Sequence, residues 1–258
     1  MEKTKSFVKN ILIFAIILLL WHLASNAGIW SAYVLPSPQK VGISLVKTFQ
    51  DGELIKHLLI SLRRIAQGFS ISCILTFMLT LLAALIPAIE PYYSSLLGVI
   101  RHIPPISLIP LFILWFGIGE LPKVIVIVLA SIFPVLLNTE SGIFGCDKGL
   151  IEVGRVMGFS KSNIFFKIML PNAVPEILVG IRIGLGYAWR AIVGAEMIAA
   201  ASGLGYFILD SQTLSRTDKV IAGILVIGGF GLITDRVCTL TEKFAVRHRG
   251  GRVENGCV

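Results

Sequence analysis

Four charged residues stand close together in an otherwise apolar part of the chain. Glu152, Arg155, Lys161 and Lys167 fall within sixteen positions of the segment 152–171, EVGRVMGFSKSNIFFKIMLP. So many charges are too costly to bury in hydrocarbon, so the segment must lie in water. Such side chains suit electrostatic contact with a partner protein. Alternatively, Glu152 and Arg155 form an ordinary i, i+3 ion pair, which contributes roughly a few tenths of a kcal/mol.

The spacing within this segment predicts two short helices joined by a bend. Residues 150–157 can form two helical turns, and Gly158 can adopt the positive φ that ends a helix. Ser160 can then cap a second helix that runs to Met169. Pro171 either ends that helix or begins the next one. The same pattern also fits an ordinary helical hairpin on a protein surface.

A second set of charges lies inside an apolar run. Arg182, Arg190 and Glu196 fall within residues 173–200, where an unpaired charge costs roughly 2.5 to 3.5 kcal/mol on insertion scales. At about 100° per residue, one broad helix face carries all three. Arg190, near the middle, is the candidate to attract an anion in a translocation cavity. For Arg182, snorkelling to the membrane surface is the favoured explanation, whereas Glu196 can pair with a neighbouring helix or contact a substrate.

The sequence shows no catalytic, metal or nucleotide motif. ATP hydrolysis would need a Walker A loop with a Gly-Lys pair, and no Gly-Lys dipeptide occurs. The four cysteines and four histidines are dispersed, without the spacing of a zinc site or a disulfide framework. We therefore expect that the chain is not an enzyme, binds no metal and no cofactor, and depends on a separate subunit for any ATP hydrolysis.

The composition indicates an all-α integral membrane protein. Of 258 residues, 55% are hydrophobic and only 15% are charged, well outside the range of soluble domains. The net charge of +8 does not indicate a nucleic-acid partner, because the basic residues are scattered between apolar runs. Six transmembrane helices are predicted, at about residues 11–24, 61–86, 96–116, 122–138, 173–200 and 219–234.

Prolines and glycines predict local features of these spans. The third span contains Pro104, Pro105 and Pro110, so we expect a kinked or broken helix that faces the bundle interior or a wet cavity. In the last span, four glycines should permit close helix approach: Gly223, Gly228, Gly229 and Gly231.

The segments outside the spans bear on topology. Residues 25–57 predict an external loop with one amphipathic helix, and residues 202–218 predict a polar loop. Lys and Arg side chains favour a cytoplasmic N-terminus and C-terminus, with thirteen on the inside and eight on the outside. Arg63 and Arg64 count against this orientation.

The segment 152–171 resembles the EAA loop of ABC importer permeases. Glu152, Gly158 and the terminal Ile168-x-Leu170-Pro171 stand at the separations of that loop, although Val153 and Gly154 replace its two alanines. Other stretches are similar to the nitrate, sulfonate and taurine branch of this family. They are Leu35-Pro-Ser-Pro38, Ser61-Leu-Arg-Arg64, Ile109 to Glu120, Gly180-Ile-Arg182, Ala195-Glu196 and Ser202 to Tyr206.

The resemblance implies a type I ABC importer permease fold in the bacterial inner membrane. Two ATPase subunits would hold ATP and magnesium, a second copy of the chain would complete the pore, and an external binding protein would deliver substrate. It implies that six residues couple to the ATPase: Glu152, Arg155, Gly158, Ile168, Leu170 and Pro171. The candidates for the translocation pathway are Pro104, Pro105, Arg190 and Glu196.

The resemblance also implies a division of the chain and a class of cargo. Residues 1–60 would form the first helix and an external loop, 61–245 the permease core with the coupling loop 148–171, and 246–258 a basic cytoplasmic tail. Sulfonates or taurine, moved inward by alternating access, are the first expectation, followed by nitrate and a thiamine-precursor pyrimidine. A passive channel or secondary carrier remains the alternative from another class, with Glu196 as its one strong carboxylate.

Overall fold

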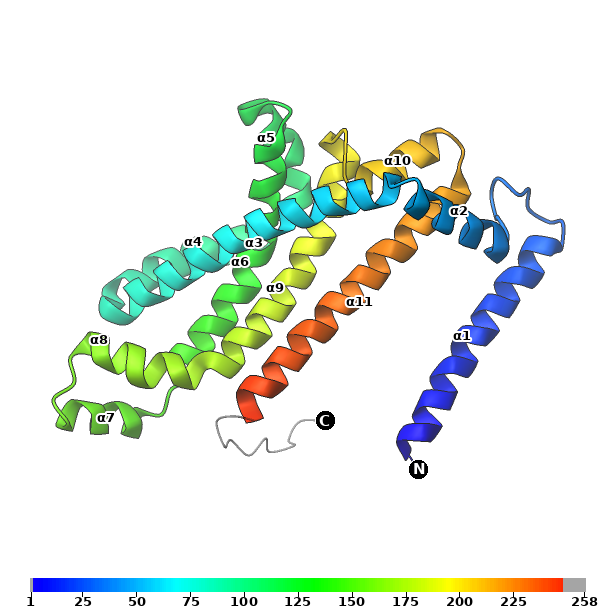
Figure 1. The fold of residues 1–258 in the computed structure, drawn as a ribbon. Coiled ribbons are helices and arrows are strands. Elements are labelled where there is room, and N and C mark those ends of the chain that lie inside the picture. The colour runs from blue at the N-terminus through cyan, green and yellow to red at the C-terminus, as the bar shows by residue number, and fades with distance from the viewer. Residues whose placement is uncertain (1, 248–258) are drawn as a thin grey trace. The chain divides into compact units, whose positions relative to one another are not determined.

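The computed structural model describes residues 2–247, which form helices joined by short turns, without a strand in that range (Figure 1). The helices are α1 (Glu2–Asn26), α2 (Pro38–Gln50), α3 (Glu53–Leu85), α4 (Glu90–Ile100), α5 (Ile109–Phe116), α6 (Glu120–Phe144), α7 (Lys148–Val156), α8 (Lys161–Ile164), α9 (Leu170–Ala199), α10 (Leu204–Thr213) and α11 (Thr217–Arg247). The predicted basic tail from residue 248 onward lies outside the described residues.

Within residues 2–247, four helices are long and apolar enough to cross a membrane: α3, α6, the continuous run Lys161–Ala199 and α11 up to Ala245. The segments Pro87–Ile100 and Pro105–Phe116 form a fifth candidate, bent by 84°. The apolar helical stretch of α1 described at Leu12–Asn26 is shorter than these. An all-α membrane fold is therefore confirmed, while the number of six spans stays a prediction.

The prolines of the third predicted span break the helix rather than bend it gently. Pro104 has ψ 121°, an extended conformation, as expected for a residue that precedes another proline. Pro110 lies in the first turn of α5. Backbone N–H groups have no helical acceptor there, so the missing N–H of a proline costs no hydrogen bond. The expected break is thus confirmed, and it places Arg101 and His102 in the connection between α4 and α5.

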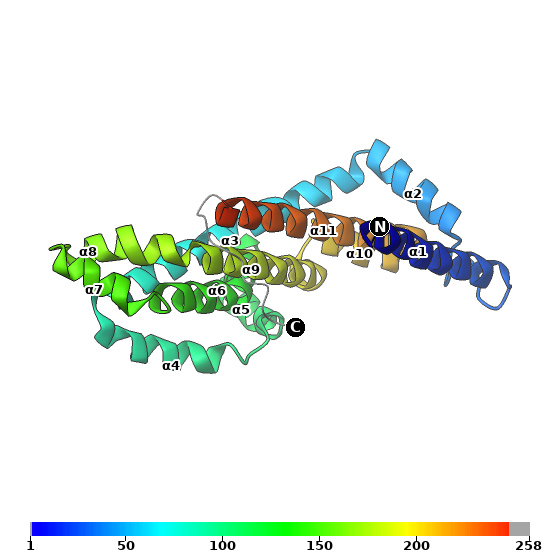
Figure 2. The same cartoon turned by 90° about the horizontal axis from the view of Figure 1, so that it is seen from below.

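The described helices group into two compact units, residues 2–60 with 201–229 and residues 61–200 with 230–247. In the second unit, α6 and α9 pack side by side along their lengths (Figures 1 and 2). Small residues allow this approach, because a Cβ built on Gly142, Gly180 or Gly184 would lie 2.5 to 2.9 Å from atoms of the facing helix.

The glycines of α11 fulfil the prediction of close approach only in part. A Cβ on Gly223 would lie 2.9 Å from a side-chain carbon of Ile208, so this glycine permits close packing. The prediction is wrong within the described chain for Gly228 and Gly229, which have no neighbouring atom within 4 Å of such a Cβ. These two glycines lie on the outer side of a helix whose other side carries the contacts.

The first unit confirms one expected helix and corrects one expected loop. Ser37 caps α2, the amphipathic helix predicted in residues 25–57, by accepting a hydrogen bond from the Lys40 N–H. The prediction of a polar loop over residues 202–218 is wrong, because α10 occupies most of it. Leu204, Phe207 and Ile208 form one buried face at helical spacing, and the polar residues 210–213 that follow it conceal the helix in the sequence.

Candidate functional site

The charged segment begins with helix α7, which also exposes several apolar side chains. Val156 is 89% exposed, and Val153 and Met157 are more than half exposed. Glu152 lies beside them on the outer surface, whereas Gly154 is buried on the inner side. These apolar side chains and the Glu152 carboxylate thus lie together on the exposed surface of the segment. We call Glu152, Val153, Val156 and Met157 the outer face of α7.

The bend after α7 depends on Gly158. Its φ of +76° lies in the left-handed region that glycine adopts without strain. The Gly158 N–H donates to Arg155 O, and the Phe159 N–H donates to Gly154 O, both at 3.0 Å. This pair of bonds is the Schellman arrangement, which satisfies the last carbonyls of a helix. The predicted helix end at Gly158 is therefore confirmed.

The second helix of the segment continues directly into a membrane span. Ser160 caps α8 by accepting a hydrogen bond from the Asn163 N–H at 3.2 Å, as expected. One wider, π-type turn follows at Phe165–Met169, closed by the Leu170 N–H donating to Phe165 O. Such a turn eases the crowding that Pro171 imposes on the preceding carbonyls. Pro171 thus sits in the first turn of α9, within one 39-residue helical run from Lys161 to Ala199.

The predicted coupling residues take different places in this segment. Glu152 lies on the outer face of α7, and Ile168 packs beneath Gly154, whose built Cβ would lie 2.6 Å from Ile168 Cδ1. Leu170 and Pro171 begin α9. Arg155 lines a cavity with the start of α8. Among residues 2–247, no ion pair joins Glu152 to Arg155, so the simple surface pair is not observed.

At the other end of α9, Glu196 is fully buried in a cluster of charges. Its Oε1 accepts a hydrogen bond from Arg64 Nη1 at 2.8 Å, and the Ser61 hydroxyl lies 2.8 Å from both carboxylate oxygens. Arg64, on α3, also binds Glu120 in a bidentate pair at 2.6 Å. Lys123 lies 3.2 Å from the same Glu120 carboxylate. The Glu196 charge is thus neutralised by a neighbouring helix, one of the two roles that the sequence left open.

The same cluster explains a basic residue that counted against the expected orientation. Arg64 is 3% exposed and bound to two carboxylates. It is therefore not a free positive charge in a loop. Arg64 should not be counted against a cytoplasmic N-terminus, whereas Arg63 still counts against it. Three stretches noted in the sequence contain Arg64, Glu120 and Glu196, but their spacing did not show that these side chains meet, although a charged residue next to an apolar run is a general sign of a buried partner.

Arg182 and Arg190 separate in the structure. Arg182 lies 3.3 Å from Asp235 and from Glu242 of α11, and its side chain is 38% exposed. Its snorkelling to the membrane surface stays a prediction. The Arg190 guanidinium stacks over the Tyr187 ring, 5.6 Å from its centre.

A cavity of about 420 Å³ lies where the broken helix meets α6 and α9. Arg101, His102 and Pro105 contribute from the break, and Asn138 and Tyr187 contribute from the two long helices. Of the predicted pathway residues, Pro105 lines this cavity directly, and Arg190 is linked to it through Tyr187. The sequence reading missed Arg101, which it placed as a positive flank of a span. Its position beside three prolines was the available signal.

Comparison with known proteins defines the family. Residues 77–245 match the model of the binding-protein-dependent transport system inner membrane component. The putative aliphatic sulfonates transport permease protein SsuC of Bacillus subtilis is 39% identical over 96% of this chain and 90% of its own length. The taurine transport system permease protein TauC of Escherichia coli is 34% identical over 83% of this chain and 79% of its own.

More distant relatives agree with these matches. The bicarbonate transport system permease protein CmpB of Synechocystis is 32% identical over 88% of this chain and 84% of its own length. A solved amino acid ABC transporter shares the fold, with a TM-score of 0.66 at 19% identity over 78% of this chain and 97% of its own. The chain therefore belongs to the binding-protein-dependent transport system inner membrane components, as an ABC importer permease of the nitrate, sulfonate and taurine branch.

Proposed function

We propose that this chain is the transmembrane subunit of an ABC importer that moves a small organic anion, an aliphatic sulfonate or taurine, into the cell by alternating access. Two copies would form the pore, with both termini in the cytoplasm. Two ATPase subunits would bind beneath them, and an external binding protein would deliver the substrate. One observation carries the proposal: α7, with an exposed apolar face, connects through one bend to a continuous helix that crosses the membrane.

The outer face of α7 supports the ATPase as partner. Val156 and Met157 are apolar side chains exposed to water, and a docked protein would remove this unfavourable contact. The Glu152 carboxylate beside them can pair with a basic residue of the partner and fix the orientation of docking. ATP and magnesium would bind to the ATPase, since the permease sequence has no phosphate-binding loop.

The continuous helix from Lys161 to Ala199 supports transmission of movement. Its 39 residues correspond to a length of about 58 Å, more than the ~30 Å hydrocarbon core. A displacement of the bend at Gly158 would therefore move the far end of α9, where Arg64 clamps Glu196 to α3. The helices joined by this clamp would move as one body when the pore changes its open side.

The cavity beside the broken helix supports an anionic cargo. Arg101 brings a permanent positive charge to the lining, and His102, Asn138 and Tyr187 bring groups that can donate hydrogen bonds to a sulfonate. The names of two relatives, SsuC for aliphatic sulfonates and TauC for taurine, favour this cargo over nitrate or a pyrimidine.

Transport in proteoliposomes tests the proposal. The permease, its ATPase and its binding protein would be reconstituted together, and uptake of labelled ethanesulfonate, taurine and nitrate would be measured with and without ATP. We expect vanadate-sensitive uptake of a sulfonate that requires ATP. Equal uptake without ATP would contradict the proposal and indicate a passive channel, and uptake driven by an ion gradient would indicate a secondary carrier.

The ATPase contact has its own test. Val156→Asp places a charge at the centre of the outer face of α7 and should abolish co-purification of the ATPase. Asn163→Asp is the matched control, because it adds the same charge to an exposed position of α8 in the same segment. Co-purification that survives Val156→Asp would show that the ATPase binds elsewhere.

A further inference from the structure

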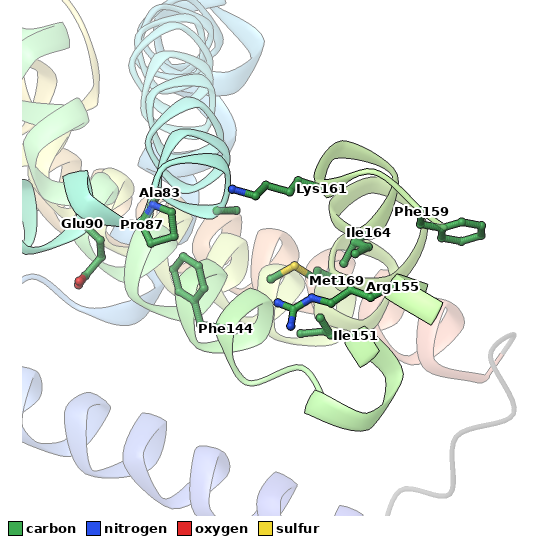
Figure 3. Close-up of a pocket in the computed structure, with 11 residues that line it drawn as sticks. Ala83, Pro87, Glu90, Phe144, Ile151, Arg155, Phe159, Lys161, Ile164 and Met169 are labelled. Carbon is green, nitrogen blue, oxygen red and sulfur yellow. The ribbon is translucent and has the colours of Figure 1, made fainter. Parts of the chain in front are cut away.

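A second, larger cavity lies beneath the bend, on the inner side of α7. Its volume is about 810 Å³. Its lining comes from the end of α3, the turn that follows it, the start of α4, the end of α6, and the segment from α7 to the end of the π-type turn. Figure 3 shows these side chains: Ala83, Pro87, Glu90, Phe144, Ile151, Arg155, Phe159, Lys161, Ile164 and Met169. The cavity is separate from the one at the broken helix, and the proposed transport mechanism does not use it.

Two positive charges enter this cavity from one side. Arg155 and Lys161 extend into it from the α7–α8 side, while Pro87 and Glu90 lie on the opposite side (Figure 3). Within residues 2–247, neither cation has a carboxylate within 4.0 Å. By contrast, Arg64, Arg182 and Arg216 all pair with acidic residues. The lining therefore carries two cations that no acidic side chain of the described chain neutralises.

The rest of the lining is mainly apolar. Ala83 and Ile164 are almost fully buried, and Phe144 and Met169 add larger apolar surface at the ends of two spans. Two cations together with apolar surface match a molecule with an anionic head and a hydrocarbon body, although Glu90 lies opposite the cations. Among the described residues, Glu90 is the only acid that lines the cavity, so the charged side chains of this lining sum to +1, which suits a head group with one negative charge.

The cavity lies at the ends of membrane helices, and this position indicates the source of such a molecule. The cavity lies where α3 ends at Leu85, where α6 ends at Phe144 and where α9 begins at Leu170. The ends of membrane helices lie at the level of the lipid head groups, and basic pockets between such ends attract anionic lipid. A phospholipid of the adjacent leaflet thus has both the charge and the access that the cavity requires.

We propose that this cavity binds an anionic phospholipid, with its phosphate between Arg155 and Lys161 and the upper part of an acyl chain against Phe144 and Met169. The same phosphate chemistry could be supplied by a free phosphate ester, so the test includes both sources. A bound lipid placed in this way would contact α6, α7 and α8 together. It would thereby support the inner side of α7, opposite the face that we assign to the ATPase.

Lipid binding to the purified full-length chain tests the site. Dioleoyl phosphatidylglycerol, dioleoyl phosphatidylcholine and soluble glycerol 3-phosphate would be titrated into detergent-solubilised protein, with binding followed by native mass spectrometry and by thermal unfolding. We expect phosphatidylglycerol to bind more tightly than phosphatidylcholine and to raise the unfolding temperature. An effect of glycerol 3-phosphate as strong as that of phosphatidylglycerol would overturn the lipid as occupant and indicate a soluble phosphate ester.

Substitutions connect binding to the two cations. Arg155→Gln and Lys161→Gln should each weaken phosphatidylglycerol binding about fivefold. Arg155→Lys and Lys161→Arg should retain it, and Glu90→Gln should strengthen it because a like charge is removed. Lys148→Gln is the control, since Lys148 belongs to α7 but does not line the cavity. Equal affinity for both lipids, or affinity that is unchanged in Arg155→Gln and Lys161→Gln, would overturn the proposal whether or not the chain transports sulfonates.

Discussion

Arg64 of α3 donates a hydrogen bond from Nη1 to Glu196 Oε1 of α9 across 2.8 Å, and the Glu196 side chain has no exposed surface. The two residues are 132 positions apart in the sequence. Removal of one partner leaves the other as a buried, uncompensated charge, which costs far more than the pair itself contributes. The cluster therefore fixes α3 against α9 more firmly than an exposed ion pair would.

The first prediction concerns the stability that depends on Arg64. Arg64→Ala should destabilise the protein by about 3 to 5 kcal/mol, because Glu196 then stays buried without its cation. Unfolding of the detergent-solubilised protein by heat or denaturant measures the effect. Arg63→Ala, at the exposed neighbouring position, is the control and should change stability by less than ~0.5 kcal/mol.

A milder variant separates the charge from the packing. Glu196→Gln removes the negative charge but keeps an oxygen that Arg64 and Ser61 can bind, and Arg64 retains Glu120. Glu196→Gln should therefore lower the free energy of unfolding much less than Arg64→Ala does. If Arg64→Ala had the same unfolding temperature as the wild type, the cluster would make no net contribution to the stability of the protein.

The second prediction concerns the bend at Gly158. A residue with a Cβ at φ +76° is strained by roughly 1 to 2 kcal/mol, although no atom lies within 4 Å of that Cβ. Gly158→Val should therefore displace α7 and uncouple ATP hydrolysis from transport while membrane insertion continues. Gly158→Asn should behave nearly like the wild type, because asparagine tolerates left-handed backbone. Comparable loss of coupling in both variants would mean that size, and not backbone conformation, matters here.

The third prediction concerns the contact between Gly154 and Ile168. A Cβ on Gly154 would lie 2.6 Å from Ile168 Cδ1, the flexible end of a side chain. Gly154→Ala should therefore lower transport by displacing Ile168. The double variant Gly154→Ala with Ile168→Val should restore it, since valine lacks the methyl group that collides. A double-mutant cycle in uptake rate measures this coupling, and strictly additive effects would contradict direct contact.

The fourth prediction concerns the charge in the smaller cavity. Arg101→Gln should raise the KM for sulfonate uptake about tenfold or more, because a charge-assisted hydrogen bond to the anion is lost. Arg190→Ala should have a smaller effect, since Arg190 reaches the cavity only through Tyr187. Initial rates at varied substrate concentration distinguish the two. Unchanged kinetics in Arg101→Gln would exclude this cavity from substrate binding, and unchanged kinetics in Arg190→Ala would remove Arg190 from the pathway.

Local signals in the sequence predicted the elements that depend on near neighbours. The helix end at Gly158, the cap at Ser160 and the break at Pro104 follow from φ, ψ and hydrogen-bond restrictions within a few residues. The apolar composition predicted an all-α membrane protein for a similar reason, since each span must satisfy its own backbone hydrogen bonds. The polar residues of α10 misled the prediction, because its buried apolar residues Leu204, Phe207 and Ile208 all lie in the first half of the helix and polar residues fill the second half.

The sequence by itself therefore determined the membrane class, the bend of the charged segment and the family of this protein. Tertiary structure alone decided that Glu196 pairs with Arg64, that Arg182 pairs with residues of α11, and that Arg101 lines a cavity. The physical reason is that helix periodicity and capping are local, whereas the partner of a buried charge depends on which helices pack together. That packing depends on small residues such as Gly180 and Gly184, whose contacts lie far away in the chain.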